Sequence, residues 1–175
     1  MGEPGQDERY HQAAAEYGPA LERLARGYEF DPDRRRDLLQ EIHLALWRSF
    51  AVFDGRCSPR TWVYRVAHNT AVSYGIARRR SGDRSLVSLE AVEAELAGAG
   101  SDGGAAADRQ VLARVTELIQ RLEPLDRQVI LSYLEGMEAS EIGEITGLAP
   151  GNVATKIHRI KAVLARRFSQ GRQHA

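Results

Sequence analysis

The sequence predicts an all-α protein made of two small helical domains, and three observations support this fold class. Apolar residues recur at spacings of three and four along most of the chain, which is the helical period. A segment rich in glycine, alanine and acidic residues separates two such stretches. The last part has the pattern of two helices joined by a tight turn. We expect a first domain over 10–82, a flexible acidic linker over 83–107, and a helix-turn-helix domain over 108–170.

The first domain should open with a helix whose apolar side consists of Tyr10, Ala14, Tyr17, Leu21, Leu24 and Tyr28. Residues 1–9 show no periodicity, and we expect them to form a tail. Gly18-Pro19 should kink this helix or divide it, because proline lacks a backbone N–H. Asp31 followed by Pro32 is typical of the start of the next helix.

That next helix has two contrasting faces. The core-facing stripe consists of Leu38, Leu39, Ile42, Leu46 and Phe50. The opposite face consists of Asp37, Gln40, Glu41, Leu44 and Arg48. An apolar stripe at this spacing packs against a neighbouring helix, and the other side remains in water. The exposed side is mostly acidic and amide in character, which favours a partner different from that of the basic helix that follows.

The basic helix should begin at Ser58, with Pro59 at its first position. No acidic residue occurs between Asp54 and Asp83, whereas six arginines do: Arg56, Arg60, Arg65, Arg78, Arg79 and Arg80. On this helix Trp62, Arg65, Asn69 and Ser73 share one side. Proteins bind single-stranded nucleic acid through aromatic rings, positive charge and amide groups. The alternatives are a core role for Trp62 and an ordinary solvent-facing position for Asn69.

Charge along the chain also indicates nucleic acid, although the net charge is zero. Residues 1–82 carry +2, residues 83–107 carry −4, and residues 108–175 carry +2. Two windows without acidic residues, 55–82 and 149–175, each contain six basic residues. Segregated charge of this kind is typical of nucleic-acid contact, and the alternative for each window is a solvated helix face.

The second domain begins with a helical stripe of Val111, Leu112, Val115, Leu118, Ile119 and Leu122. A second helix should start at Pro124 and end at Gly136. Residues 138–161 then read as a helix-turn-helix with Gly147 at the turn. The outward face of its last helix carries Asn152, Thr155, Lys156, Arg159 and Arg166. Short polar and long basic side chains there suit major-groove recognition, and an ordinary helical hairpin is the alternative.

The chain resembles the extracytoplasmic-function (ECF) group of bacterial sigma factors. In the first domain the resemblance is carried by Asp37-Leu38-x-Gln40-Glu41, Trp47, Phe53-Asp54-Gly55-Arg56, Thr61-Trp62-x-Tyr64-Arg65 and Asn69. In the second it is carried by the run Pro124–Val129 and by Glu135-Gly136. Three positions depart from the family pattern. Glu138 and Ala149 replace hydroxyl N-caps, each at a cost of about 1 kcal/mol, and Ala154 stands where a basic residue is common.

The resemblance implies an alternative sigma factor with three contact surfaces. The surface for core RNA polymerase would be Asp37, Leu38, Gln40, Glu41 and Leu44. The surface for the minus-ten promoter element would be Arg56, Arg60, Trp62, Arg65, Asn69, Ser73, Arg78 and Arg79. The surface for the minus-thirty-five element would be Asn152, Thr155, Lys156 and Arg159. The family also implies an anti-sigma factor as a further partner, and a linker that threads the polymerase channel.

Other functional classes find little support in the sequence. The five histidines are scattered without a nucleophile or metal partner, and we expect neither enzymatic activity nor a cofactor. A single cysteine, Cys57, excludes an internal disulfide. We expect a cytoplasmic protein, because no signal peptide or membrane span is visible. The remaining alternative is a stand-alone helix-turn-helix regulator that binds duplex DNA, although the first domain lacks the acidic cluster of a phosphoacceptor pocket.

Overall fold

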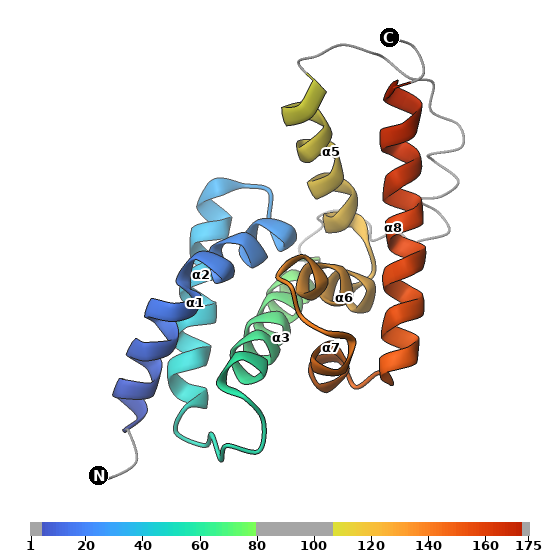
Figure 1. Ribbon diagram of the computed structural model, residues 1–175. Coiled ribbons are helices and arrows are strands. Elements are labelled where there is room, and N and C mark those ends of the chain that lie inside the picture. Colours follow the sequence, from blue (N-terminus) through green and yellow to red (C-terminus); the bar gives the residue numbers. More distant parts are fainter. Residues whose placement is uncertain (1–4, 80–106, 173–175) are drawn as a thin grey trace.

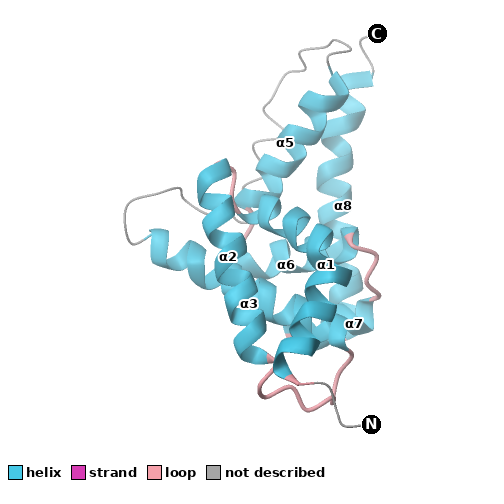
Figure 2. Ribbon diagram, turned by 90° about the vertical axis from the view of Figure 1, so that its left-hand side faces the viewer, coloured by secondary structure: helices cyan, strands magenta, loops and turns pink. Residues whose placement is uncertain are grey.

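A computed structural model describes residues 5–79 and 107–172, and its helices form two groups that lie against each other (Figures 1 and 2). The first group contains α1 (Gln6–Tyr28), α2 (Pro32–Ser49) and α3 (Pro59–Arg79). The second contains α5 (Ala107–Arg121), α6 (Pro124–Leu134), α7 (Ala139–Thr146) and α8 (Pro150–Arg172). The all-α prediction is confirmed, and within the described ranges there is no strand. The predicted linker lies outside the described residues except for its last position.

Helix α1 begins earlier than the sequence predicted. It starts at Gln6, whose amide donates to the carbonyl of Trp47 at 2.8 Å, and the Trp47 indole N–H donates to Asp7 at 2.7 Å. Part of the expected tail, residues 6–9, is therefore helical and packed on α2. Pro19 lies inside the helix, which continues unbroken to Tyr28. Its ribbon changes direction partway along, as expected of a helix that contains proline (Figure 1).

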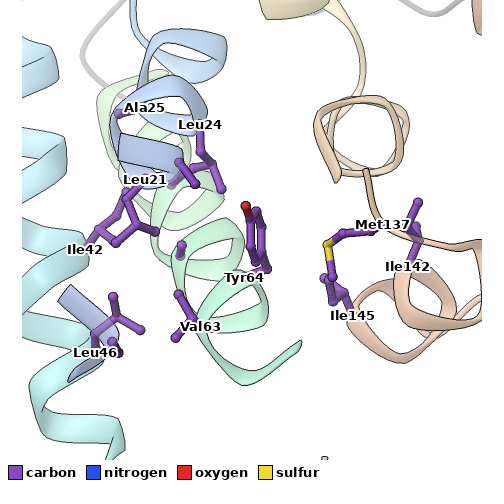
Figure 3. Close-up of a cluster of buried hydrophobic side chains, with 14 of the residues drawn as sticks. Leu21, Leu24, Ala25, Ile42, Leu46, Val63, Tyr64, Met137, Ile142 and Ile145 are labelled. Carbon is purple, nitrogen blue, oxygen red and sulfur yellow. The ribbon is translucent and has the colours of Figure 1, made fainter. Parts of the chain in front are cut away.

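The first group encloses the apolar stripe that the sequence predicted for α2. Leu38, Ile42, Leu46 and Phe50 are buried, together with residues of α1 and α3 (Figure 3). Both expected helix starts are capped. Asp31 accepts hydrogen bonds from the backbone N–H groups of residues 33 and 34, and Ser58 accepts one from the N–H of residue 61, each at 3.0 Å.

The second group has a smaller core of its own, made of Leu118, Ile119, Leu122, Ile130, Ile160 and Val163. The Arg127 guanidinium donates to the carbonyls of Ile119, Gln120 and Leu122, and so satisfies the end of α5. Gly136 and Gly147 have φ angles of 74° and 78°, which explains the glycines that end α6 and α7.

The start of α7 has a polar contact that was not predicted from the sequence. The Glu141 carboxylate accepts a hydrogen bond at 2.8 Å from the backbone N–H of Glu138, the residue that precedes the helix. This is the glutamate half of a capping box. Glu141 thus satisfies the N–H of Glu138, which is a different donor from the one that the family's hydroxyl would serve.

The two groups share one continuous core. Val129, Met137, Ile142 and Ile145 belong to the same buried cluster as the residues of α1–α3. Figure 3 shows the Tyr64 ring of α3 between the α1 side chains and Met137. Gly27 permits a close approach of the groups, because a Cβ atom there would lie 2.6 Å from the methyl groups of Leu131. The predicted domains are thus packed together.

This shared core predicts that damage in the second group destabilises the first. Ile142 is fully buried, and Ile142→Ala should lower the free energy of unfolding by about 2–5 kcal/mol. Both tryptophans lie in the first group. When unfolding by denaturant is monitored by tryptophan fluorescence and by circular dichroism, the midpoints of both transitions should therefore shift together. A tryptophan transition that stays at the wild-type midpoint would show that the groups unfold independently.

Candidate nucleic-acid interface

Helix α2 presents to solvent the polar face that the sequence predicted. Asp37, Gln40, Glu41 and Leu44 are all exposed, Leu44 to 40%. Leu38 differs, because it is fully buried in the core. It supports this face from beneath, and a partner protein docking on α2 cannot reach it. The remaining four residues lie on the exposed side of α2, and three of them are acidic or amide residues.

The loop between α2 and α3 is shaped by local contacts. Gly55 has a φ angle of 74°, a conformation that glycine adopts at no steric cost. The Asp54 carboxylate accepts a hydrogen bond at 3.1 Å from the backbone N–H of Arg56 and pairs with its guanidinium at 3.0 Å. Phe53 anchors the loop by packing on Trp62, with ring centroids 5.2 Å apart. The loop thus displays Arg56 at the surface, next to the first turn of α3.

One side of α3 faces solvent beyond this loop. Asn69 and Ser73 are exposed, one helical turn apart. Trp62 is only half-buried, but its indole N–H donates to the Ser49 hydroxyl at 3.0 Å and its ring packs on Phe53. Trp62 thus packs on the core through one part of its ring while another part remains exposed. The amide and hydroxyl groups further along the helix remain accessible.

The arginines of α3 have partners elsewhere in the chain. Arg78 pairs with Glu29 at 2.7 Å. Arg60 donates to the backbone carbonyl of Glu135 at 2.7 Å, and Arg65 donates to that of Glu144 at 2.8 Å. The latter two bonds join α3 to the second group of helices. The side chain of Arg79 lies outside the described residues.

Helix α8 projects polar residues from its first three turns, as the sequence predicted. Asn152, Thr155 and Arg159 are exposed, and the turn before the helix is tight because Gly143 lies against the carbonyl of Leu148. Lys156 instead forms an ion pair with Asp126 of α6. Its ammonium group is therefore held against its own domain in this arrangement.

Two features of the interface were not predicted from the sequence. His158 is exposed on α8 beside the outward face, next to the accessible Ala154, and helical spacing could have revealed its position. Glu135 was noted only as part of the motif that ends α6. Its carboxylate accepts two hydrogen bonds from Arg23 of α1, both at 2.7 Å, and one from the Tyr64 hydroxyl at 3.3 Å. No sequence pattern indicates a pairing across 112 positions of the chain.

A buried histidine lies where the two groups of helices meet. His68 of α3 is fully buried, with Nδ1 2.9 Å from the Tyr28 hydroxyl of α1 and Nε2 3.0 Å from the Ser132 hydroxyl of α6. Burial lowers the pKa of His68 from 6.5 to about 3. Burial also raises the pKa values of Tyr28 and Tyr64. These three groups are therefore neutral around pH 7.

Comparison with known proteins identifies the family. The Sigma-70 region 2 profile matches residues 13–84, and the Sigma-70 region 4 profile matches residues 112–164. RNA polymerase sigma factor CnrH of Cupriavidus metallidurans is 28% identical over 168 residues, which cover 92% of this chain and 87% of that protein. The ECF RNA polymerase sigma-E factor of Escherichia coli is 30% identical over 141 residues, which cover 73% of this chain and 70% of that protein.

A solved structure of CnrH in complex with the cytosolic domain of CnrY shares the fold. It matches with a TM-score of 0.64 at 24% sequence identity, and covers 91% of this chain and 87% of the CnrH chain. The chain belongs to the ECF sigma factors of the sigma-70 family. As an alternative sigma factor, it works with core RNA polymerase and promoter DNA to direct promoter recognition and transcription initiation.

Within the described ranges, no helix is long and apolar enough to cross a membrane. In the same part of the chain, no group of three or more His, Cys, Asp or Glu side chains is placed to hold a metal ion.

The buried histidine generates a pH prediction. The unfolded chain takes up a proton at His68 near pH 6.5, whereas the packed chain does so only near pH 3. Stability should therefore fall as pH drops below 6.5, by at most about 1.4 kcal/mol per pH unit, and this loss should end near pH 3. His68→Gln keeps polar atoms but cannot titrate. Urea unfolding of both proteins at pH 7.5 and 5.5 should show a smaller loss in the variant, and equal losses would contradict this account.

Proposed function

We propose that the exposed face of α2 docks on core RNA polymerase through Asp37, Gln40, Glu41 and Leu44. The observation that carries this proposal is the division of α2 into a buried stripe and a contiguous acidic and amide face. A helix fixed on one side by a core offers its other side as a rigid docking surface. This face lies within the residues that match Sigma-70 region 2, the region in which the family resemblance implies polymerase contacts.

The same three-helix group would read the minus-ten element with α3 and the preceding loop. Asn69 and Ser73 are exposed and can address base edges, because an amide carries both a donor and an acceptor. The guanidinium groups of Arg56, Arg60 and Arg65 would bind phosphates of the DNA backbone. Trp62 would act mainly by fixing the loop through Phe53. Arg78 and Arg79 would extend the basic surface at the end of the helix.

The minus-thirty-five element would be read by the first turns of α8. Asn152, Thr155 and Arg159 are exposed there, and His158 extends the same surface. Lys156 would have to exchange Asp126 for a phosphate in order to contact DNA. The region 4 match covers this helix-turn-helix. None of these roles requires covalent bonds to be made or broken, and we therefore assign the chain no enzymatic activity. We also assign it to the cytoplasm.

A protein inhibitor is a further proposed partner, as CnrY is found with CnrH. A groove of about 940 Å³ lies between α1, α5 and α6, with Leu24, Leu131 and Leu134 among its lining residues. Leu112 and Leu134 are 65% and 60% exposed there. Because both groups of helices line the groove, an apolar segment of an anti-sigma factor bound in it would hold the packed arrangement.

The α2 face is tested by reversing its charge. Asp37→Lys with Glu41→Lys should abolish binding to core polymerase in a pull-down, while stability changes by less than about 0.5 kcal/mol, since both residues are exposed. Glu22→Lys with Glu117→Lys makes the same change in charge at exposed positions of α1 and α5 and should bind normally. If the first variant folds and still binds core like the control, the docking face lies elsewhere.

The α3 face is tested at Asn69. Asn69→Ala should leave core binding unchanged but relax the preference at one minus-ten position, with a cost of about 1–3 kcal/mol for a lost base contact. Transcription from a promoter library randomised across that element measures the preference. Gln12→Ala removes an exposed amide from α1 and serves as the control. A variant with wild-type sequence preference and activity would exclude Asn69 from base recognition.

A further inference from the structure

One ion pair inside the second group of helices involves a residue of the proposed DNA-reading surface. The Lys156 ammonium of α8 lies 2.5 Å from the Asp126 carboxylate of α6. The Asp126 side chain is only 12% exposed and the Lys156 side chain 35%. Among the described residues, no other side chain pairs with this carboxylate. The charge of Asp126 is therefore balanced by Lys156.

Helical spacing places Lys156 at the border between two faces of α8. Val153 and Ile160, three residues before it and four after it, are fully buried. Asn152, four residues before it, is exposed on the outward face. Residues three or four apart are neighbours on a helix surface. A long side chain at this border can reach either the protein or a DNA backbone, and Lys156 is turned toward the protein.

Asp126 cannot follow its partner toward DNA, because the start of α6 is fixed. Asp126 occupies the first turn of α6, where the helix dipole favours a carboxylate. The next residue, Arg127, is buried, and its guanidinium donates to backbone carbonyls at the end of α5. A core that includes Ile130 and Ile160 then joins α6 to α8. The carboxylate therefore stays at one place beside α8.

The exchange of Asp126 for a DNA phosphate would leave this carboxylate without a partner. Removal of one member of a largely buried ion pair is strongly destabilising, because the remaining charge stays desolvated and uncompensated. A lysine contact with phosphate lies in water and is weakened by salt, whereas a partly buried pair is screened much less. The balance of these two effects favours the ion pair, and more so as the salt concentration rises.

We propose that Asp126 is a positioning residue that keeps Lys156 on the protein when α8 reads the minus-thirty-five element. Asn152 and Thr155 then address base edges from the exposed face, and Lys156 makes no phosphate contact. The proposal rests on the proposed function, because it takes α8 to be the helix that reads this element. A neutral residue at position 126 would release Lys156 and add one phosphate contact, which does not depend on the DNA sequence.

The test measures how salt affects promoter binding by the full-length chain in complex with core polymerase. The probe is a fluorescent promoter duplex, selected by transcription from a library randomised across the minus-thirty-five element. Each lysine contact with a phosphate adds about 0.9 to the slope of log affinity against log salt concentration. Asp126→Asn removes the charge and keeps the shape of the side chain, and it should make the slope steeper by about this amount.

The matched control is Glu123→Gln. It makes the same change in charge at an exposed residue just before α6, whose side chain makes no cap hydrogen bond, and it should keep the wild-type slope. Over a fourfold rise in salt, the ratio of the Asp126→Asn affinity to the wild-type affinity should fall by about 3.5-fold.

A double variant shows whether Lys156 causes this change. Addition of Lys156→Met to Asp126→Asn keeps the alkyl stem but removes the ammonium group, and it should restore the wild-type slope. The double variant has no unpaired buried charge at this site. It therefore decides the question even if Asp126→Asn alone fails to fold by circular dichroism.

Two results would overturn the proposal. If Asp126→Asn folds and has the same slope as Glu123→Gln, Asp126 does not hold Lys156 back. If the slope of the double variant is about 0.9 shallower than that of wild type, Lys156 contacts a phosphate in the wild-type complex.

The proposed function is tested separately by Asn152→Ala combined with Thr155→Ala. If this variant relaxes the sequence preference at minus-thirty-five positions in transcription from the library, α8 reads the element, and the proposed function stands even where the salt slopes overturn the role of Asp126. If it keeps the wild-type preference, α8 does not read the element, and both proposals fail whatever the salt slopes are.

Discussion

The packing of α3 against α6 and α7 is the constraint on which the rest of the structure depends. Tyr64 lies between the two halves of the core, and its hydroxyl meets the carboxylate that also binds Arg23. Apolar burial supplies most of the driving force at such a surface, and the polar pairs fix its register. Because the core is continuous, the position of α8 relative to α2 follows from this one contact.

This packing leaves the proposed contact faces of α2, α3 and α8 exposed to different degrees. The polar face of α2 is exposed, because its buried stripe packs on the core and its polar side meets no other helix among the described residues. Asn152 and Thr155 at the start of α8 are exposed as well. On α3, Arg60 and Arg65 instead donate to backbone carbonyls of the second group.

Much of this could be predicted from the sequence, because it depends on local pattern. The α2 stripe, the caps at Asp31 and Ser58, and the glycine turns follow from helical spacing and backbone preference. The sequence could not reveal the role of Glu135, which depends on a residue 112 positions away. It also placed Leu38 on a contact surface although the residue is buried. Spacing assigns a residue to a face, but packing decides which face is covered.

The distance between the two groups of helices in the free chain tests the central claim, their shared core, most directly. Spin labels on cysteines introduced at Glu22 of α1 and Ala165 of α8, in a Cys57→Ser background, report it by electron–electron double resonance. Both positions are exposed. The account predicts one narrow distance distribution, because the core is continuous. A broad distribution, as expected of two independent groups, would contradict it.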